Sequence, residues 1–211
     1  MIVAIDGPAA AGKGTLARAL ADAFDLAYLD TGALYRATAL RTLRADIDPA
    51  DAPAIAAQAN AITPEDLADP ALRAEATGEM ASKVSALTDV RAALLEFQRR
   101  FAASPPGGAK GAVLDGRDIG TVVCPEAEIK IFITASDEVR AHRRWLELSG
   151  RGEDISEAQV LADMRSRDAR DAERATAPMK AAEDAHLLDT SNLDIDASFV
   201  AAKAIYLGTE T

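Results

Sequence analysis

The stretch GPAAAGKGT, residues 7–15, constrains the fold of this chain more than any other segment. It follows IVAID (2–6), whose apolar run predicts a buried parallel strand, and it leads into TLARALADAF (15–24), which predicts a helix. Glycines let backbone N–H groups curl around an anion, and a helix N-terminus adds partial positive charge. We therefore predict a loop that binds the phosphates of a nucleoside triphosphate, formed by Gly7, Pro8, Ala9, Ala10, Ala11, Gly12, Lys13, Gly14 and Thr15.

The loop departs from the pattern G-x-x-x-x-G-K-[ST] at its last position. Gly14 stands where a hydroxyl normally helps to hold Mg²⁺, and Thr15 comes one residue later. We expect Mg²⁺ to depend more on water and on the substrate phosphates, with Asp115 supporting it through water. The alternative for Asp115 is an aspartate that only forms the turn at the end of its strand.

Four further segments predict strands: LAYLD (26–30), GAVLD (111–115), IKIFITA (129–135) and HLLDT (186–190). Most are followed by helical patterns, so the fold class is α/β, with a five-strand parallel sheet and helices on both faces. Residues 46–101 are helical in pattern throughout, and SPPGGAKG (104–111) interrupts this pattern. We predict a core of residues 1–45 and 111–211 and an inserted lobe of residues 46–110.

The charged residues are unevenly distributed. A net charge of −11 argues against non-specific binding to nucleic acid or to an anionic membrane. Arginines number 17 against six lysines, and eight of them lie between residues 140 and 174. Such a segment indicates a local anion site, since guanidinium groups bind phosphate bidentately. Arg167, Arg170, Asp171 and Arg174 share one helical face; the alternative is a solvated face of salt bridges, but the phosphate loop favours function.

Other features of the sequence exclude several functions. Cys124 is the only cysteine, so no intrachain disulfide can form, and we expect it to be buried. His142 and His186 are isolated from each other and from any cysteine pair, which gives no support to a zinc site. No leader-like segment and no apolar run of membrane-spanning length occur, so we expect a cytoplasmic protein.

Three stretches join the loop in a resemblance that covers nearly the whole chain. LDTGALYR (29–36), DGRDIGTVVCPEAEIKIFITAS (115–136) and RDARDAERATAP (167–178) are similar, in order and spacing, to bacterial cytidylate kinases. The resemblance implies a P-loop NTPase-type core, a helical NMP-binding insertion and an arginine-rich lid at about 140–175. Two departures are Ala10, where the family often has glycine, and the absence of the extra antiparallel strands that many members carry in the insertion.

The resemblance also implies a reaction and an acceptor site. The reaction is transfer of the γ-phosphoryl group of ATP to CMP or dCMP, with Mg²⁺ as cofactor and room for weaker activity with UMP. Asp118 suits cytosine because a carboxylate accepts from the N4 amine, which uracil lacks. The resemblance implies that the acceptor phosphate is bound by Arg36, Arg117 and Arg174 and the ribose by Arg167 and Asp171. It implies that the cytosine edge is read by Ser82, Arg91 and Asp118 and that the pocket is lined by Thr31 and Tyr35. The implied catalytic residues are Lys13, Arg117 and Arg174.

Arginines at 140, 143, 144 and 151 flank the turn GRGED (150–154), which we interpret as a lid edge that closes over the donor and excludes water. We expect Trp145 to anchor the lid helix by packing. For Tyr35, the alternative to a pocket residue is a core residue.

Two other functions stay open: a kinase for another acceptor, such as a different nucleoside monophosphate or a shikimate-like compound, or a regulatory P-loop NTPase. A GTPase switch needs N-K-x-D and D-x-x-G, which this sequence lacks. We expect a monomer.

Overall fold

Five parallel strands form the centre of the computed structural model, which describes residues 1–208. They are β1 (Ile2–Asp6), β2 (Ala27–Asp30), β3 (Ala112–Asp115), β4 (Ile129–Thr134) and β5 (His186–Asp189), in the order β2-β3-β1-β4-β5. This confirms the predicted parallel sheet. Because β1 lies between β3 and β4, its carboxyl end is at the point where the strand order reverses, which is where ligands bind in open α/β sheets.

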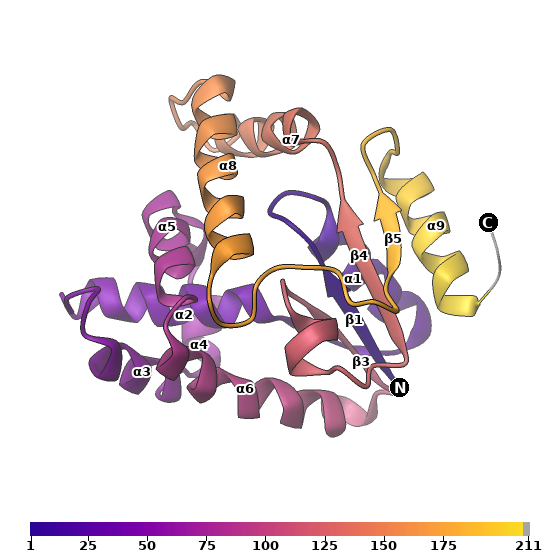
Figure 1. The fold of residues 1–211 in the computed structure, drawn as a ribbon, viewed down its shortest axis with the longest axis horizontal. Helices are drawn as coiled ribbons and strands as arrows, with labels where there is room; N and C mark the ends of the chain where they lie inside the picture. The colour runs from indigo at the N-terminus through magenta and orange to yellow at the C-terminus, as the bar shows by residue number, and fades with distance from the viewer. Residues whose placement is uncertain (209–211) are drawn as a thin grey trace.

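Helices cover both faces of the sheet, as predicted. Helices α1 (Lys13–Phe24) and α9 (Ile195–Leu207) pack on one face, where Val3, Ile5 and Ile131 are buried. The other face is covered by the C-terminal part of α6 (Thr88–Ala103) and by a short π-helix, η3 (Ile119–Val123). Figure 1 shows α9 beside β5 and α6 below the sheet.

The segment between β2 and β3 is helical throughout, as the sequence indicated. After α2 (Thr31–Arg44) come α3 (Ala52–Asn60), α4 (Pro64–Ala68), η1 (Pro70–Arg73) and α5 (Glu75–Val84), then α6 and the short turn η2 (Pro106–Gly108). Thr63 caps α4 in a capping box with Asp66. These helices share a core of their own, around Leu34 and Ile55, and α6 contributes Leu94 to it and Ala102 to the sheet core.

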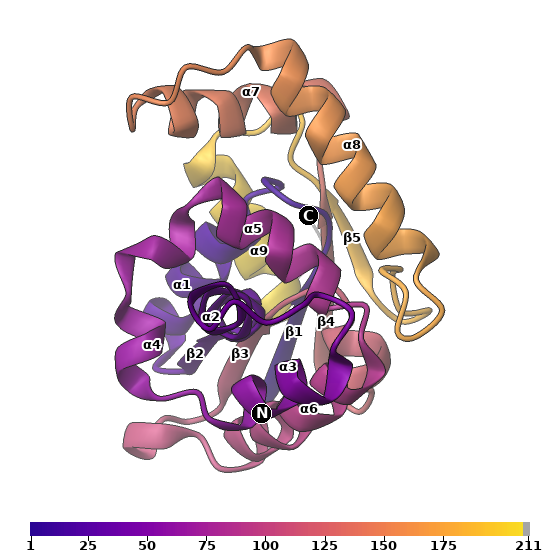
Figure 2. The ribbon, with the colours of Figure 1, turned by 90° about the vertical axis from the view of Figure 1, so that its left-hand side faces the viewer.

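Two helices stand beyond the carboxyl ends of the strands, α7 (Asp137–Ser149) and α8 (Glu157–Glu173) (Figure 2), and they contain most of the segment that is expected from the sequence to be the lid. Leu148 and Val160 pack between them, and Trp145 joins this cluster and donates from Nε1 to the carbonyl of Ile155 at 3.1 Å. Ser156 caps α8 through the Gln159 N–H, but the Gln159 side-chain amide bonds to Asp163 (2.8 Å) and does not complete a capping box.

Two smaller observations concern the cysteine and the length of the helices. Cys124 is buried, and burial raises the pKa of its thiol to about 11, which suits a packing role. Among residues 1–208, no helix combines the length and apolar composition required to span a bilayer.

Candidate active site at the carboxyl ends of the strands

The predicted phosphate loop joins β1 to α1 and has a backbone that depends on glycine. At Gly7, φ is 140° and a Cβ would lie 1.9 Å from the Ile133 carbonyl oxygen, so no larger residue fits. Gly12 has a φ of 94° and precedes α1 directly. Ala10, at the position where the family often has glycine, also adopts a left-handed φ of 56°, at a cost of about 1 kcal/mol.

Lys13 is the first residue of α1 and its side chain is buried. Its ammonium donates to the Pro8 carbonyl at 2.7 Å, which folds the side chain back over the loop. Burial lowers the pKa of Lys13 to about 7, with a further contribution from Arg117, whereas Asp115 acts in the opposite direction. A bound phosphate would therefore supply the negative charge that this buried ammonium lacks.

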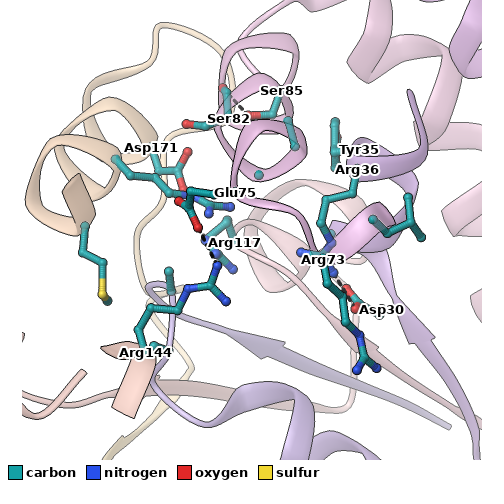
Figure 3. Close-up of a pocket in the computed structure, with 18 of the residues that line it drawn as sticks. Asp30, Tyr35, Arg36, Arg73, Glu75, Ser82, Ser85, Arg117, Arg144 and Asp171 are labelled. Carbon is teal, nitrogen blue, oxygen red and sulfur yellow. Dashed lines mark hydrogen bonds and ion pairs between the residues drawn. The ribbon is translucent and has the colours of Figure 1, made fainter. Parts of the chain in front are cut away.

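A cavity of about 490 Å³ lies between the phosphate loop, the inserted helices and the lid. Arginine side chains from several elements point into it (Figure 3). Lys13 and Asp115 line it, and so do all ten residues predicted to bind the acceptor: Thr31, Tyr35, Arg36, Ser82, Arg91, Arg117, Asp118, Arg167, Asp171 and Arg174.

Most of these arginines are paired with carboxylates. Arg36 pairs with Asp30 at 2.8 Å, and Nε of Arg117 lies 3.3 Å from Asp171. Arg167 differs, because its Nε is buried and has no hydrogen-bond partner. Burial, followed by the repulsion of Arg117, lowers the pKa of Arg167 to about 10. A buried donor without a partner in a cavity of arginines is suited to an anionic or hydroxyl-bearing ligand.

Asp118 is the centre of a second, deeper cluster. Its carboxylate pairs with Arg91 and, at 3.3 Å, with Arg174; all three side chains are less than a tenth exposed. Burial raises the pKa of Asp118, although both arginines act to lower it. The Arg91 guanidinium also lies 5.7 Å from the ring centroid of Tyr35, so this aromatic ring forms one wall of the cluster.

Two predicted hydroxyl groups are already engaged within the protein. Thr31 donates from Oγ1 to the carbonyl of Asp115 at 2.7 Å, which fixes the start of α2 against the end of β3. Ser82 accepts from Arg170 at 2.7 Å, which connects the inserted helix α5 to the lid helix α8. Both residues line the cavity, but a ligand would have to share these bonds or replace them.

The residues near Gly14 fit a divalent cation held through water. A Cβ on Gly14 would lie only 3.2 Å from Oδ2 of Asp115, so glycine at this position avoids crowding that carboxylate. Burial raises the pKa of Asp115, and Lys13 opposes this shift. Oxygen ligands and retained water are what Mg²⁺ prefers. Within residues 1–208 no three His, Cys, Asp or Glu side chains are grouped as a metal site, so a cation would rely on substrate phosphates.

A second cavity, of about 410 Å³, lies on the other side of the phosphate loop. Ala11, Gly12 and Thr15 line it together with Leu193 and Ile195. Gly7, Pro8 and Gly14 line neither cavity, whereas Ala10, Arg144 and Glu147 line both. The two cavities therefore meet beside Ala10 and Arg144.

The four lid arginines have different surroundings. Arg140 turns inward and donates to the carbonyls of Ala9 (3.1 Å) and Ala135 (3.0 Å), so it lines neither cavity. Arg143 donates to the Thr190 carbonyl at 2.8 Å. Arg144 and Arg151 reach the inserted lobe, where Arg144 pairs with Glu75 (2.7 Å) and Arg151 donates to the Arg73 carbonyl (3.0 Å).

Sequence reasoning missed several residues of this site. Asp30, which pairs with Arg36, also caps α2 through the Ala33 N–H; an aspartate directly before a predicted helix was the available signal. Arg73 and Glu75 line the cavity from the inserted lobe, and nothing in their local sequence distinguishes them from surface residues.

Taken together, a parallel sheet in the order β2-β3-β1-β4-β5, a loop with a buried lysine and an arginine-lined cavity define a P-loop kinase of the small-molecule class. The chain belongs to the cytidylate kinase family, since a sequence model of that family, described as "Cytidylate kinase", matches residues 3–206.

Curated relatives agree with this assignment. The chain is 59 % identical over 202 residues to "Cytidylate kinase" of Rhodospirillum rubrum, covering 96 % of this chain and 95 % of the relative. It is 58 % identical over 204 residues to "Cytidylate kinase" of Paramagnetospirillum magneticum, covering 97 % and 96 %.

Two crystal structures share the fold. An uncharacterized protein from Eubacterium ventriosum aligns with a TM-score of 0.54 at 16 % identity, over 98 % of each chain. A sugar kinase from Janibacter sp., in an unliganded structure, aligns with a TM-score of 0.50 at 15 % identity, over 99 % of this chain and 94 % of that chain. At these identities the likeness concerns the fold alone.

Proposed function

We propose that this protein transfers the γ-phosphoryl group of ATP to CMP or dCMP, giving ADP and CDP or dCDP. One observation carries the proposal for this chain: Lys13 of the phosphate loop and the buried Asp118–Arg91 pair line the same cavity. A nucleotide acceptor in that cavity can place its phosphate toward Lys13 and its base toward Asp118. The names of the relatives favour cytidine nucleotides as the acceptor.

The phosphate loop holds the donor. Backbone N–H groups of Gly7 and of residues 9–15 and the ammonium of Lys13 bind its phosphates, and the second cavity, beside Gly12 and Thr15, takes its nucleoside. The γ-phosphate then lies where the two cavities meet, next to Arg144. Asp115 would hold Mg²⁺ through water, and the bound ion would neutralise charge on the donor phosphates.

The acceptor phosphate is held by arginines. Arg36, Arg117 and Arg174 bind it, and with Lys13 they offset the charge that two negatively charged nucleotides bring together. The transfer is an in-line displacement, in which the acceptor phosphate oxygen forms a bond to γ-phosphorus as the bond to the leaving ADP oxygen breaks. The chain supplies position and charge, and no side chain becomes covalently bound.

The acceptor nucleoside is read by the other predicted residues. Asp118 accepts from the N4 amine of cytosine, with Arg91 and Ser82 at the remaining polar edge and Tyr35 and Thr31 as walls. Arg167 and Asp171 bind the ribose, which gives the unpartnered Nε of Arg167 a hydrogen-bond acceptor. Arg144 and Arg151 of the lid close over the site and exclude water, which would otherwise accept the phosphoryl group.

The wider organisation is part of the same proposal. Residues 46–110 act as the acceptor-binding lobe, residues of about 140–175 as the lid, and the remainder as the core. The protein works as a monomer in the cytoplasm, without nucleic acid or membrane partners.

An acceptor profile tests the proposed reaction. ADP formation from ATP and Mg²⁺ is measured with CMP, dCMP, UMP, AMP and shikimate, and without an acceptor. We expect the highest kcat/KM with CMP and dCMP, a lower value with UMP and only slow hydrolysis without an acceptor. AMP or shikimate as the best acceptor would contradict the proposal, and equal ADP formation without an acceptor would indicate a regulatory NTPase.

A further inference from the structure

Asp6 is a buried acid to which the proposed reaction gives no role. It is the last residue of β1, directly before Gly7, and its residue surface is 5 % exposed. Burial raises the pKa of its carboxyl to about 6, against the effect of two backbone hydrogen bonds. Burial of a carboxylate in a sheet core costs free energy that an apolar residue would avoid. The presence of Asp6 at this position therefore calls for an explanation in the interactions that it makes.

The contacts of Asp6 lead to the loop that carries the acceptor residues. Its two oxygens accept from the backbone N–H groups of Ile119 (2.7 Å) and Gly120 (2.8 Å). These are the first two residues of the π-helix η3, which directly follows Arg117 and Asp118. The strand that begins the phosphate loop is thereby bonded to the loop that carries Arg117 and Asp118.

The start of η3 has an unusual cap. The first N–H groups of a helix lack partners within the helix, and an aspartate at the N-cap position normally accepts from such groups itself. Asp118 holds that position, yet its side chain makes no cap hydrogen bond. Its carboxylate pairs with Arg91 and Arg174 in the cavity.

We propose that Asp6 caps η3 from the neighbouring strand and thereby leaves the Asp118 carboxylate free to face the acceptor. Asp6 is a positioning residue for acceptor recognition: it does not touch the acceptor and acts through Asp118. It also fixes this loop relative to the phosphate loop, so that donor and acceptor sites keep one spacing. The inference rests on the proposed function, because it assumes that Asp118 reads the acceptor base.

The packing around Gly120 supports a fixed position for this backbone. A Cβ on Gly120 would lie 3.4 Å from Oδ2 of Asp6 and 3.2 Å from Cδ of Lys130. Lys130 is itself held, because its ammonium pairs with Asp184 at 2.7 Å. The first turn of η3 is therefore confined between the carboxylate of Asp6 and the stem of Lys130.

The test is acceptor recognition in Asp6→Asn. Asparagine keeps the shape, but its amide presents NH₂ to one of the two N–H groups, so one bond is lost and two donors face each other. We expect the KM for CMP to rise at least tenfold and the preference for CMP over UMP to fall at least fivefold. The Kd for ADP, measured by calorimetry, should stay within twofold of the wild type.

A double variant and two single variants separate positioning from general destabilisation. If Asp6 acts through Asp118, Asp6→Asn should add no loss of CMP preference to Asp118→Asn. Val3→Ala, a core truncation in the same strand, should lower Tm and leave the preference for CMP unchanged. Gly120→Ala crowds the same contact from the other side and should reduce the preference even if Asp6→Asn fails to fold.

The inference is wrong if Asp6→Asn lowers Tm or kcat while the KM for CMP and the preference for CMP stay within twofold. It is equally wrong if the losses in the double variant are additive, or if Gly120→Ala leaves the preference intact. Failure of the proposed function would appear separately, as a wild-type enzyme without preference for CMP.

Discussion

The two ends of the cavity are built to hold anions by different means. The proposed phosphate loop offers backbone N–H groups from eight of its nine residues, because Pro8 has none, and a single charged side chain, Lys13. The acceptor end uses side chains from five separate parts of the chain, and most of its arginines are paired with carboxylates such as Asp30, Asp171 and Asp118. The first end depends on local geometry, whereas the second depends on how distant elements pack.

This difference predicts how each end responds to substitution. Most side chains of the loop can be replaced by alanine without loss of its backbone N–H groups. We therefore expect Lys13 to be the residue of the loop whose substitution has the largest effect. At the acceptor end, removal of one carboxylate leaves buried guanidinium groups unpaired, which affects both recognition and stability. Four changes test this contrast, in order of expected effect.

Lys13→Ala should have the largest effect on turnover. It removes the ammonium that offsets phosphate charge, so we expect kcat to fall by about 10²–10³-fold or more. The fold should persist, because the lost group is a buried cation whose hydrogen bond is to a loop carbonyl. Steady-state kinetics and circular dichroism measure both. Lys110→Ala, an exposed lysine far from the loop, should change kcat less than twofold; a similar loss in both variants would contradict this role for Lys13.

Asp118→Ala should separate recognition from donor binding. Two buried arginines lose their carboxylate, so we expect a loss of about 3–5 kcal/mol in the free energy of unfolding. CMP recognition should weaken by about 1–3 kcal/mol, while ADP binding is retained. Urea unfolding and calorimetry with each nucleotide provide the measurements. Equal weakening of CMP and ADP binding would show that the two ends are not independent.

The pH dependence of stability should report on Asp6, which connects the two ends. Burial raises its pKa from 3.8 in the unfolded chain to about 6, so the folded state binds this proton more tightly. The contribution of Asp6 to stability is therefore present below about pH 4 and is lost as the pH rises through 6, with a slope of at most about 1.4 kcal/mol per pH unit.

Comparison of Asp6→Asn with the wild type isolates this contribution. The wild type should lose stability relative to the variant between pH 4 and 6, and the difference should be constant from pH 7 to 8. Urea unfolding across this range measures it. A difference that does not change with pH, or one that changes in the opposite direction, would argue against a buried carboxyl at this position.

Glu75→Gln should have the smallest effect. Glu75 pairs with the lid residue Arg144 at 2.7 Å, but its side chain is 48 % exposed, and such pairs contribute about 0.2–1 kcal/mol. We expect kcat/KM to change less than about fivefold, and the change should shrink at high salt. Glu79→Gln, on the same helix but paired with Lys83, is the matched control. A larger loss that salt does not reduce would mean that this pair does more than hold the lid.

The comparison also explains what the sequence could predict. The five strands and the all-helical segment between β2 and β3 follow from short contiguous patterns, and the structure confirms them. The proposed phosphate loop follows from such a pattern as well. The acceptor residues came from family resemblance, because no local pattern brings Arg36, Arg91 and Asp118 together. Glu75, the partner of Arg144, and the inward turn of Arg140 were not predicted, since these contacts arise only when α5, α7 and the phosphate loop pack. Asp30, the partner of Arg36, was missed although it lies directly before α2.

The π-helix η3 was missed for a similar reason. Its first two N–H groups are satisfied by Asp6, a residue more than a hundred positions earlier in the chain, whereas Asp118, the aspartate that begins DIGTVV, makes no cap hydrogen bond. Here the local capping rule fails because a side chain of another element, Asp6 of β1, supplies the acceptors.

A crystal structure with ADP and CMP bound tests the central claim most directly. We predict that the ADP phosphates lie against backbone N–H groups of residues 9–15 beside Lys13, and that the cytosine N4 amine lies within hydrogen-bond distance of Asp118. Phosphates bound away from Lys13, or a cytosine ring that does not approach Asp118, would contradict the account.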